Sequence, residues 1–149
     1  MTVNISSKSR YAVRALAELA ALEAEAGDRA VPLGEIAERR EIPQQFLEQV
    51  FATLRRSRIV RSRRGVNGGY RFARPPADVT VLDVVTALDG APSPAGCTDG
   101  PCVHAPECGA ASIWSEAKEA LEAVLRGTTI ADLAEREAGN RSGSAMYYI

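Results

Sequence analysis

Hydrophobic residues in the first third of the chain recur at steps of three and four, the spacing of one face of a helix. This pattern predicts three helices, over residues 8–25, over about 33–40 and from Pro43 onward. Ser6 or Ser7 can cap the first, and Pro43 suits the opening turn of the third because its N–H would have no partner there. The expected core positions are Tyr11, Val13, Ala15, Leu16, Leu19, Ala20, Leu22, Leu33, Ile36, Ala37, Phe46, Leu47, Val50, Phe51 and Leu54.

Two short strands are predicted next, over residues 59–63 and 70–73. The segment between them contains Asn67-Gly68, the strongest two-residue signal for a tight hairpin turn. Three helices followed by a hairpin are the order of a winged helix-turn-helix, with the third helix as recognition helix and the hairpin as wing. The fold class is therefore expected to be mainly α with a two-stranded wing, and residues 1–76 are expected to form this domain.

Residues 77–149, after two prolines, are expected to form a second region. A helix is predicted over about 80–89, although its β-branched residues leave a strand as the alternative. Residues 90–109 contain four glycines, four prolines and three cysteines, so a loop with little internal packing is expected there. A long helix follows over 110–126, and Thr129 with Asp132 can cap a short helix over 130–137. The tail is polar and rich in Gly and Ser, and it ends in Met-Tyr-Tyr-Ile.

The helix over 110–126 has an apolar side that a small winged domain cannot cover. That side consists of Ile113, Trp114, Ala117, Leu121, Val124 and Leu125, while Glu116, Glu119 and Glu122 line the other. Pairing with a second copy of the chain would bury it, since two-fold dimers are the common oligomer. Packing within one chain is the alternative. A dimer would also space two recognition helices about 34–36 Å apart, one turn of DNA.

The net charge of −1 conceals a division between the two halves of the chain. Residues 1–74 carry an excess of six positive charges and residues 75–149 an excess of seven negative ones. Residues 55–74 contain eight arginines and no acid, which favours contact with a polyanion such as nucleic acid over an ordinary solvated face. The chain has no apolar signal core and no apolar stretch of about 20 residues, so a cytoplasmic protein is expected.

Polar residues on the recognition helix and basic residues on the wing are the candidate DNA contacts. Glutamine can pair with adenine in the major groove, and glutamate can accept from cytosine. Glycines in the wing would let the backbone approach phosphate or the minor groove, although a tight turn alone also explains them. The candidates are Gln44, Gln45, Glu48, Gln49, Arg55, Arg61, Arg63, Arg64, Asn67, Gly68 and Gly69, with Gly65 also at the tip of the wing.

Cys97, Cys102 and Cys108 are the only cysteines of the chain, and all lie in the loop. Their spacing does not match the paired CxxC motifs of structural zinc, whereas iron–sulfur clusters accept uneven spacing. An iron–sulfur cluster, 2Fe–2S or 4Fe–4S, is therefore the expected cofactor. Structural zinc and redox-active thiols without metal remain as alternatives. The fourth ligand stays open; the loop offers His104, the only histidine, and also Asp99 and Glu107.

Three segments resemble the Rrf-type family of bacterial winged-helix transcriptional regulators, whose members include IscR, NsrR and CymR. They are Ser7-Lys-Ser-Arg-Tyr-Ala-Val-Arg-Ala, Ile42-Pro-Gln-Gln-Phe-Leu-Glu-Gln-Val and the wing, Val60-Arg-Ser-Arg-Arg-Gly-Val-Asn-Gly-Gly-Tyr. The terminal Met146-Tyr-Tyr-Ile is similar to the tail of CymR. The resemblance implies a homodimeric regulator whose helices over 110–126 cross at the interface, and it places the three cysteines where cluster-binding members carry their ligands.

Two positions depart from the family pattern. Where the iron–sulfur-biogenesis regulator has a histidine after its last cysteine, this chain has Ala111, and where some nitric-oxide sensors have an acid near the amino terminus it has Arg10. The expected function is a DNA-binding repressor controlled by a cluster that senses redox state, nitric oxide or iron supply. The alternative is a cluster-free, CymR-like regulator acting through thiols or a partner enzyme. No catalytic constellation is evident, so an enzyme is not expected.

Overall fold

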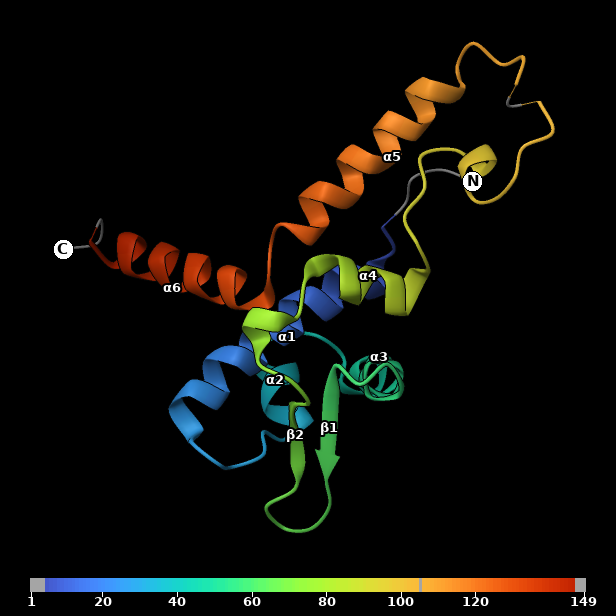
Figure 1. Cartoon of the computed structure of the whole chain (residues 1–149). Coiled ribbons are helices and arrows are strands. Elements are labelled where there is room, and N and C mark those ends of the chain that lie inside the picture. Colours follow the sequence, from blue (N-terminus) through green and yellow to red (C-terminus); the bar gives the residue numbers. More distant parts are fainter. Residues whose placement is uncertain (1–4, 105, 147–149) are drawn as a thin grey trace.

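The computed structural model describes residues 5–104 and 106–146 and has a winged body from which one long helix projects (Figure 1). Its elements in chain order are α1 (Ser7–Ala26), α2 (Leu33–Arg40), α3 (Gln44–Arg56), β1 (Val60–Arg63), β2 (Gly69–Phe72), the 3-10 turn η1 (Pro76–Asp78), α4 (Val81–Asp89), the 3-10 turn η2 (Gly96–Thr98), α5 (Ala111–Arg126) and α6 (Ile130–Met146). The predicted winged helix-turn-helix is confirmed, as is the helical choice for the segment around 80–89.

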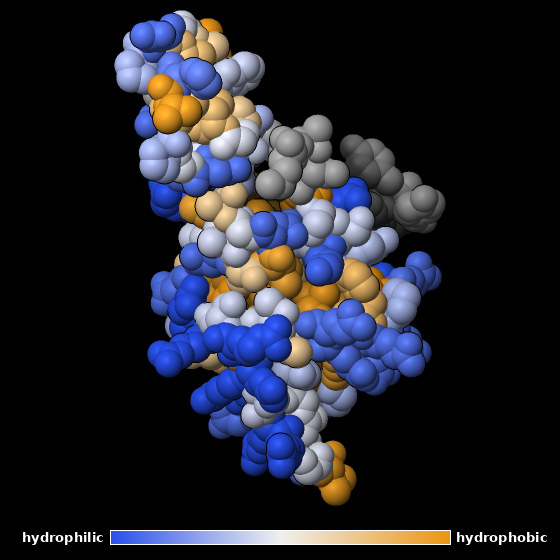
Figure 2. All heavy atoms as spheres, turned by 90° about the vertical axis from the view of Figure 1, so that its right-hand side faces the viewer, coloured by the Kyte–Doolittle hydropathy of each residue, from blue (hydrophilic) through white to orange (hydrophobic). Residues whose placement is uncertain are grey.

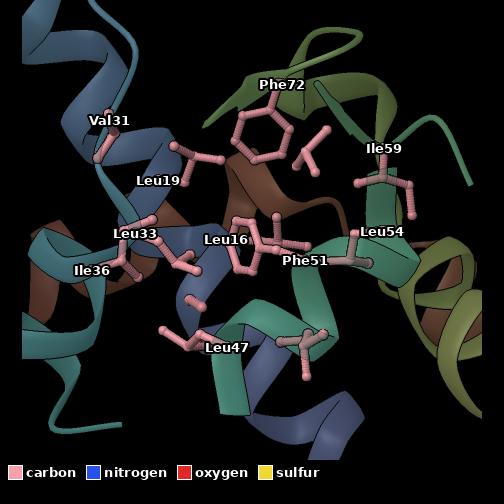
Figure 3. Close-up of a cluster of buried hydrophobic side chains, with 14 of the residues drawn as sticks. Leu16, Leu19, Val31, Leu33, Ile36, Leu47, Phe51, Leu54, Ile59 and Phe72 are labelled. Carbon is pink, nitrogen blue, oxygen red and sulfur yellow. The ribbon is translucent and has the colours of Figure 1, made fainter. Parts of the chain in front are cut away.

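The core of the body lies where α1, α2 and α3 meet the base of the wing (Figure 3). Phe51 of α3 is fully buried there, near Leu16 and Leu19 of α1 and Phe72 of β2. The expectation of a buried Tyr11 is wrong, because its side chain is 39 % exposed. Tyr11 packs edge-on against Phe46 instead, at 5.6 Å between ring centroids.

The wing is an antiparallel pair in which Val60 lies opposite Phe72 and Arg63 opposite Gly69. Its turn is closed by the Gly68 N–H, which donates to the Gly65 carbonyl at 2.9 Å. The prediction of a two-residue turn at Asn67-Gly68 is therefore wrong: the turn spans residues 65–68, and the glycines with positive φ are Gly65 and Gly69. A longer loop forms because pairing already ends at Arg63 and Gly69.

Segments beyond residue 76 complete the core of the body. Val79 and Val84 from α4 and its approach, and Ile130 at the start of α6, belong to the same buried cluster as Phe51. Thr129 and Asp132 exchange the two hydrogen bonds of a capping box, as predicted. The cysteine loop and α5 lie between α4 and α6 in the chain, so both ends of this segment are fixed to the winged body.

Helix α6 is longer than the sequence indicates. It continues through residues 139–144, expected as a tail, and reaches Met146. The reason is tertiary: Glu137 pairs with Arg40 of α2, and Arg141 lies 3.3 Å from the Glu18 carboxylate of α1. These contacts outweigh the poor helix propensity of the glycines in this segment. The closing Tyr147, Tyr148 and Ile149 lie outside the described residues.

Helix α5 projects away from the body, with the cysteine loop at its outer end (Figure 1). None of its residues is buried; Ile113 is 59 % exposed and Val124 69 %. Hydrophobic side chains are visible on this projecting part in Figure 2, whereas the wing end is mostly hydrophilic. The apolar side of α5 is therefore only partly covered within the described part of the chain, since Ala117, Leu121 and Leu125 are half-buried.

Candidate nucleic-acid interface and metal centre

The first two turns of α3 present a polar face to solvent. Gln44, Gln45, Glu48 and Gln49 are all exposed, as expected for residues that read bases. Gln44 donates weakly to the Glu48 carboxylate at 3.4 Å, so the two side chains lie along one line of the helix. The opposite face of α3 is buried through Leu47, Val50, Phe51 and Leu54, which fixes the direction in which the polar face points.

Two of the eight arginines between 55 and 74 are neutralised within the fold. Arg71 lies near Glu23 and Asp28 of the α1 end, and Arg74 pairs with Asp83 at 3.1 Å. No carboxylate of the described residues lies within ion-pair distance of the other six. Of these, Arg55 donates to the Ser62 hydroxyl at 3.2 Å and joins α3 to the wing. The remaining basic surface consists of Arg55, Arg56, Arg58, Arg61, Arg63 and Arg64, all exposed.

The glycines of the wing have reasons within the protein. A Cβ on Gly69 would overlap the Val31 carbonyl oxygen, because Val31 and Tyr70 form an antiparallel bridge beside the wing. A Cβ on Gly68 would overlap the carbonyl oxygen of Arg63. The missing side chains are thus required by the hairpin itself. Gly65 differs, because open space surrounds it and only its φ of 107° favours glycine.

A nearly buried carboxylate fixes the first helix of the helix-turn-helix. Glu18 of α1 is 2 % exposed and accepts from Arg40 Nε of α2 at 2.6 Å. Burial raises the pKa of Glu18, but the hydrogen bonds and charges of Arg40 and Arg141 outweigh burial and hold the pKa below its ordinary value. Because Arg40 also pairs with Glu137, this network joins α1, α2 and α6.

A second polar contact joins the end of α4 to the beginning of α1. Asp89 accepts from the Ser6 N–H at 2.9 Å and from the Ser9 hydroxyl at 2.7 Å. Partial burial raises the pKa of Asp89, and the hydrogen bonds from Ser6 and Ser9 more than offset it, so the pKa lies below its ordinary value. Since the cysteine loop begins at the next residue, Asp89 fixes one root of that loop to the helix that starts the winged body.

The three cysteines line one hollow between the loop and α5, with a volume of about 540 Å³. Cys97 and Cys108 are exposed and Cys102 is half-buried. The opposite wall is formed by α5 through Ala111, Ser115, Lys118, Glu119 and Glu122. Lys118 Nζ donates to the Thr98 carbonyl at 2.9 Å and so holds the turn that contains Cys97 against the helix.

The donor set of this hollow fits an iron–sulfur cluster. All three cysteines line one space, and soft thiolates are the ligands that such clusters favour. Within residues 5–104 and 106–146, no three His, Cys, Asp or Glu side chains are close enough to hold a single metal ion. A cluster places its ligands on several metal atoms, so they stand farther apart than ligands of one ion. The loop donors Asp99, His104 and Glu107 are exposed and do not line the hollow.

Sequence reasoning missed the contribution of α5 to this hollow. Ser115, Lys118, Glu119 and Glu122 recur at helical spacing on a polar side of α5 that adjoins its apolar stripe, which was the available signal. This side of α5 becomes part of a site only because the cysteine loop folds back over it, and the sequence does not indicate the path of the loop. Glu18 was missed as well, because a single acid within an apolar stripe gives no sign of its arginine partners.

A recognition helix with an exposed polar face beside an arginine-rich hairpin defines a winged-helix DNA-binding protein. The family model Rrf2, described as an iron-dependent transcriptional regulator, matches residues 5–136. The chain belongs to the Rrf2 family, and it is therefore a transcriptional regulator rather than an enzyme. The structure contains no helix, within its described ranges, that is long and apolar enough to cross a membrane.

Relatives cover nearly the whole chain. An HTH-type transcriptional regulator of Mycobacterium tuberculosis strain H37Rv is 35 % identical over 135 residues, which are 89 % of this chain and 81 % of the relative. The regulator IscR of Escherichia coli is 33 % identical over 136 residues, 91 % of this chain and 82 % of IscR.

Solved structures show the same fold. IscR from T. potens has a TM-score of 0.70 at 33 % identity and covers 90 % of this chain and 88 % of its own. CymR, the global cysteine regulator of B. subtilis, has a TM-score of 0.73 at 31 % identity, with 89 % and 97 % covered. The resemblance to the family, inferred from three short segments, is confirmed over the length of the chain.

Proposed function

We propose that this chain is a dimeric repressor whose affinity for promoter DNA is set by an iron–sulfur cluster held at Cys97, Cys102 and Cys108. The observation that carries the proposal is the single hollow lined by all three cysteines and by α5. Residues 1–76 would read DNA and residues 77–149 would hold the cluster and the partner subunit. The name of the family, and IscR among the relatives, support iron-linked control.

The DNA-reading part consists of the polar face of α3 and the wing. Gln44, Gln45, Glu48 and Gln49 would face base edges in the major groove, where glutamine and glutamate side chains can distinguish bases. Arg55, Arg61, Arg63 and Arg64 would contact phosphates, with Asn67, Gly68 and Gly69 carrying the wing into the minor groove. Support comes from the exposure of the four α3 residues, of the arginines and of Asn67, and from the absence of carboxylate partners for these arginines among the described residues.

The exposed apolar side of α5 would pack against the same side of a second copy. Trp114 is 40 % exposed and Ile113 59 %, in a helix without a buried residue. A two-fold pair of α5 helices would remove these side chains from water and place two winged bodies at a fixed separation. DNA half-sites one helical turn apart would then select dimers of that geometry.

Control by the loop follows from how it is anchored. Asp89 ties one root to α1, and Lys118 ties the turn of Cys97 to α5. A cluster bound at the hollow would be held by Cys97, Cys102 and Cys108, which would tie three points of the loop to one another beside α5. A loop fixed in one conformation would hold the two winged bodies at the separation that the DNA half-sites require. Cluster binding and DNA binding would then be coupled by a free energy of about 1–3 kcal/mol, the usual scale for linked sites.

The test is a paired measurement on protein purified without oxygen after expression with ample iron and sulfide. Iron and acid-labile sulfide are counted, the visible spectrum is recorded, and promoter affinity is measured before and after removal of iron by a chelator. The proposal predicts a coloured protein whose affinity changes by roughly 5- to 150-fold on iron removal. A coloured protein whose affinity does not change would contradict cluster control.

A second candidate is control by the thiols themselves. One observation in its favour is that Cys97 and Cys108 are exposed. The other is that, among the described residues, the three cysteines are not close enough together to bind a single metal ion. CymR relatives of known structure have the same fold, and the CymR of Staphylococcus aureus has a crystal structure in an oxidised form. In this case the anaerobic protein is colourless and free of iron, and oxidation changes its affinity for DNA.

A further inference from the structure

We infer that Glu119 of α5 is the fourth ligand of the cluster, an inference that rests on the proposed function. The starting point is a shortage of thiols. The chain has three cysteines, whereas iron–sulfur clusters are commonly held by four protein ligands. One donor must therefore be a different side chain, and it must reach the hollow that the three cysteines share.

The loop itself does not provide this donor in the hollow. Asp99, His104 and Glu107 are all exposed, and none of them lines the hollow. Ala111, at the start of α5, lines it but has only a methyl group. Among the described residues that line the hollow, the candidates that remain are on the side of α5 that faces the cysteines.

That side of α5 offers Ser115, Glu119 and Glu122, which follow one another at steps of four and three. A carboxylate is an anionic oxygen ligand, whereas the serine hydroxyl is neutral at ordinary pH. Glu122 already lies 3.5 Å from Arg126 in an ion pair on the same helix. Glu119 has no cation within ion-pair distance among the described residues, so binding a metal costs it no existing partner.

Lys118 brings the cysteines toward this carboxylate. Lys118 precedes Glu119 in α5, and its Nζ donates a hydrogen bond to the carbonyl of Thr98, which follows Cys97 in the loop. This hydrogen bond keeps the Cys97 turn beside the part of α5 that carries Glu119. The ammonium group also lines the hollow, where it offsets part of the negative charge that thiolates and a carboxylate bring together. A ligand at Glu119 would join the cluster directly to α5, the helix proposed to form the dimer.

The experiment compares four full-length variants with the unmodified chain after anaerobic loading with ferrous iron and sulfide. Glu119→Gln removes the negative charge but keeps the side-chain shape, and Glu119→Cys supplies a thiolate in its place. Glu122→Gln tests the neighbouring carboxylate. Glu116→Gln is the matched control, because Glu116 is exposed on the same helix and does not line the hollow. The readouts are the visible and electron paramagnetic resonance spectra and the rate of bleaching by an iron chelator.

We expect Glu119→Gln to alter the spectra and to bleach at least about tenfold faster, since even indirect supports of metal ligands cost 10- to 100-fold in affinity. Glu119→Cys should bleach slowly again, with a spectrum changed by the added sulfur. Glu116→Gln should match the unmodified chain, and Glu122→Gln should alter the spectra and the bleaching rate much less than Glu119→Gln. Circular dichroism confirms folding, which an exposed glutamine should leave intact.

Two results would overturn the inference while leaving the proposed function in place. In one, Glu119→Gln keeps the spectrum and bleaching rate of the unmodified chain. In the other, Glu122→Gln changes the spectrum and the bleaching rate as much as Glu119→Gln does. A different result, in which the unmodified chain takes up no iron and sulfide at all, would refute the proposed function and the inference together.

Discussion

The winged body and helix α5 differ in how far their side chains are buried. In the body, Phe51, Leu16 and Ile36 are fully buried, and the ion network around Glu18 ties three helices together. Helix α5 has sixteen residues and none is buried. The body therefore owes its structure to its own core, whereas α5 contributes no buried residue to any core.

The difference indicates how the molecule can respond to a signal. A region held by many buried contacts keeps one shape until it unfolds, so it is suited to presenting a fixed reading surface. A region with few buried contacts changes shape at little cost in free energy. The loop and α5 are therefore the parts of the chain on which the proposed cluster and the proposed partner subunit would act.

The largest expected effect is on the stability of the body. Phe51→Ala should lower the free energy of unfolding by about 3–5 kcal/mol, the usual cost of emptying a buried aromatic site. Trp114→Ala, the matched change on α5, should cost less than about 0.5 kcal/mol at concentrations where the chain is monomeric. Urea unfolding followed by circular dichroism measures both. Equal losses would show that α5 shares the core of the body.

Breaking the network at Glu18 should be nearly as severe. Glu18→Gln removes the charge facing Arg40 in a nearly buried place, and losing one partner of a buried pair costs about 3–5 kcal/mol. Because the folded pKa of Glu18 lies below the unfolded value of about 4.3, its contribution is full above that pH and is lost as pH falls through the folded pKa. Unfolding curves between pH 7 and 3 should converge for variant and parent. Curves that stay parallel would show that Glu18 is not responsible.

The partner of α5 is tested by the same Trp114→Ala variant at higher concentration. An aromatic residue at the centre of an interface often contributes about 2 kcal/mol or more to association, so the dimer should weaken by roughly 30-fold. Sedimentation equilibrium gives the dissociation constant. An unchanged constant would remove this face from the dimer contact, and Glu116→Ala on another side of α5 is the control for nonspecific effects.

The smallest expected effect concerns the wing. Arg63→Ala should weaken binding to all DNA sequences and reduce the slope of log affinity against log salt by about one unit for the lost phosphate contact. Glu48→Ala is the contrasting variant, since it should change base preference and leave the slope as it was. Fluorescence anisotropy over a series of salt concentrations separates the two. A slope that changes in neither Arg63→Ala nor Arg64→Ala would remove the wing from the interface.

The body could be predicted well from sequence because its elements are specified locally. Helical periodicity around Leu33 and Ile36 gave the bounds of α2, and the buried face of α3 was apparent from Leu47 to Leu54. The errors have tertiary causes. Residues 139–144 are helical because Glu18 and Arg40 bind that helix, and Gly69 is needed because Val31 passes beside it. Neither partner is near in sequence.

The cysteine site could be predicted only in part. The three cysteines identified the loop, because soft ligands in an otherwise cysteine-free chain are conspicuous. The α5 wall with Lys118 and Glu119 could not be predicted, since nothing local in the sequence tells which side of a long helix a flexible loop will cover. Charge segregation did indicate the wing, but it could not tell that Arg71 and Arg74 are already paired within the fold.

The central claim is that a metal cluster bound at the cysteine hollow determines the affinity of the winged bodies for promoter DNA. Its most direct test is promoter affinity of anaerobic, iron- and sulfide-replete protein against the variant with Cys97, Cys102 and Cys108 all changed to serine. The account predicts affinities that differ by roughly 5- to 150-fold, with equal affinity for random DNA. Identical promoter affinity in the two proteins would contradict it.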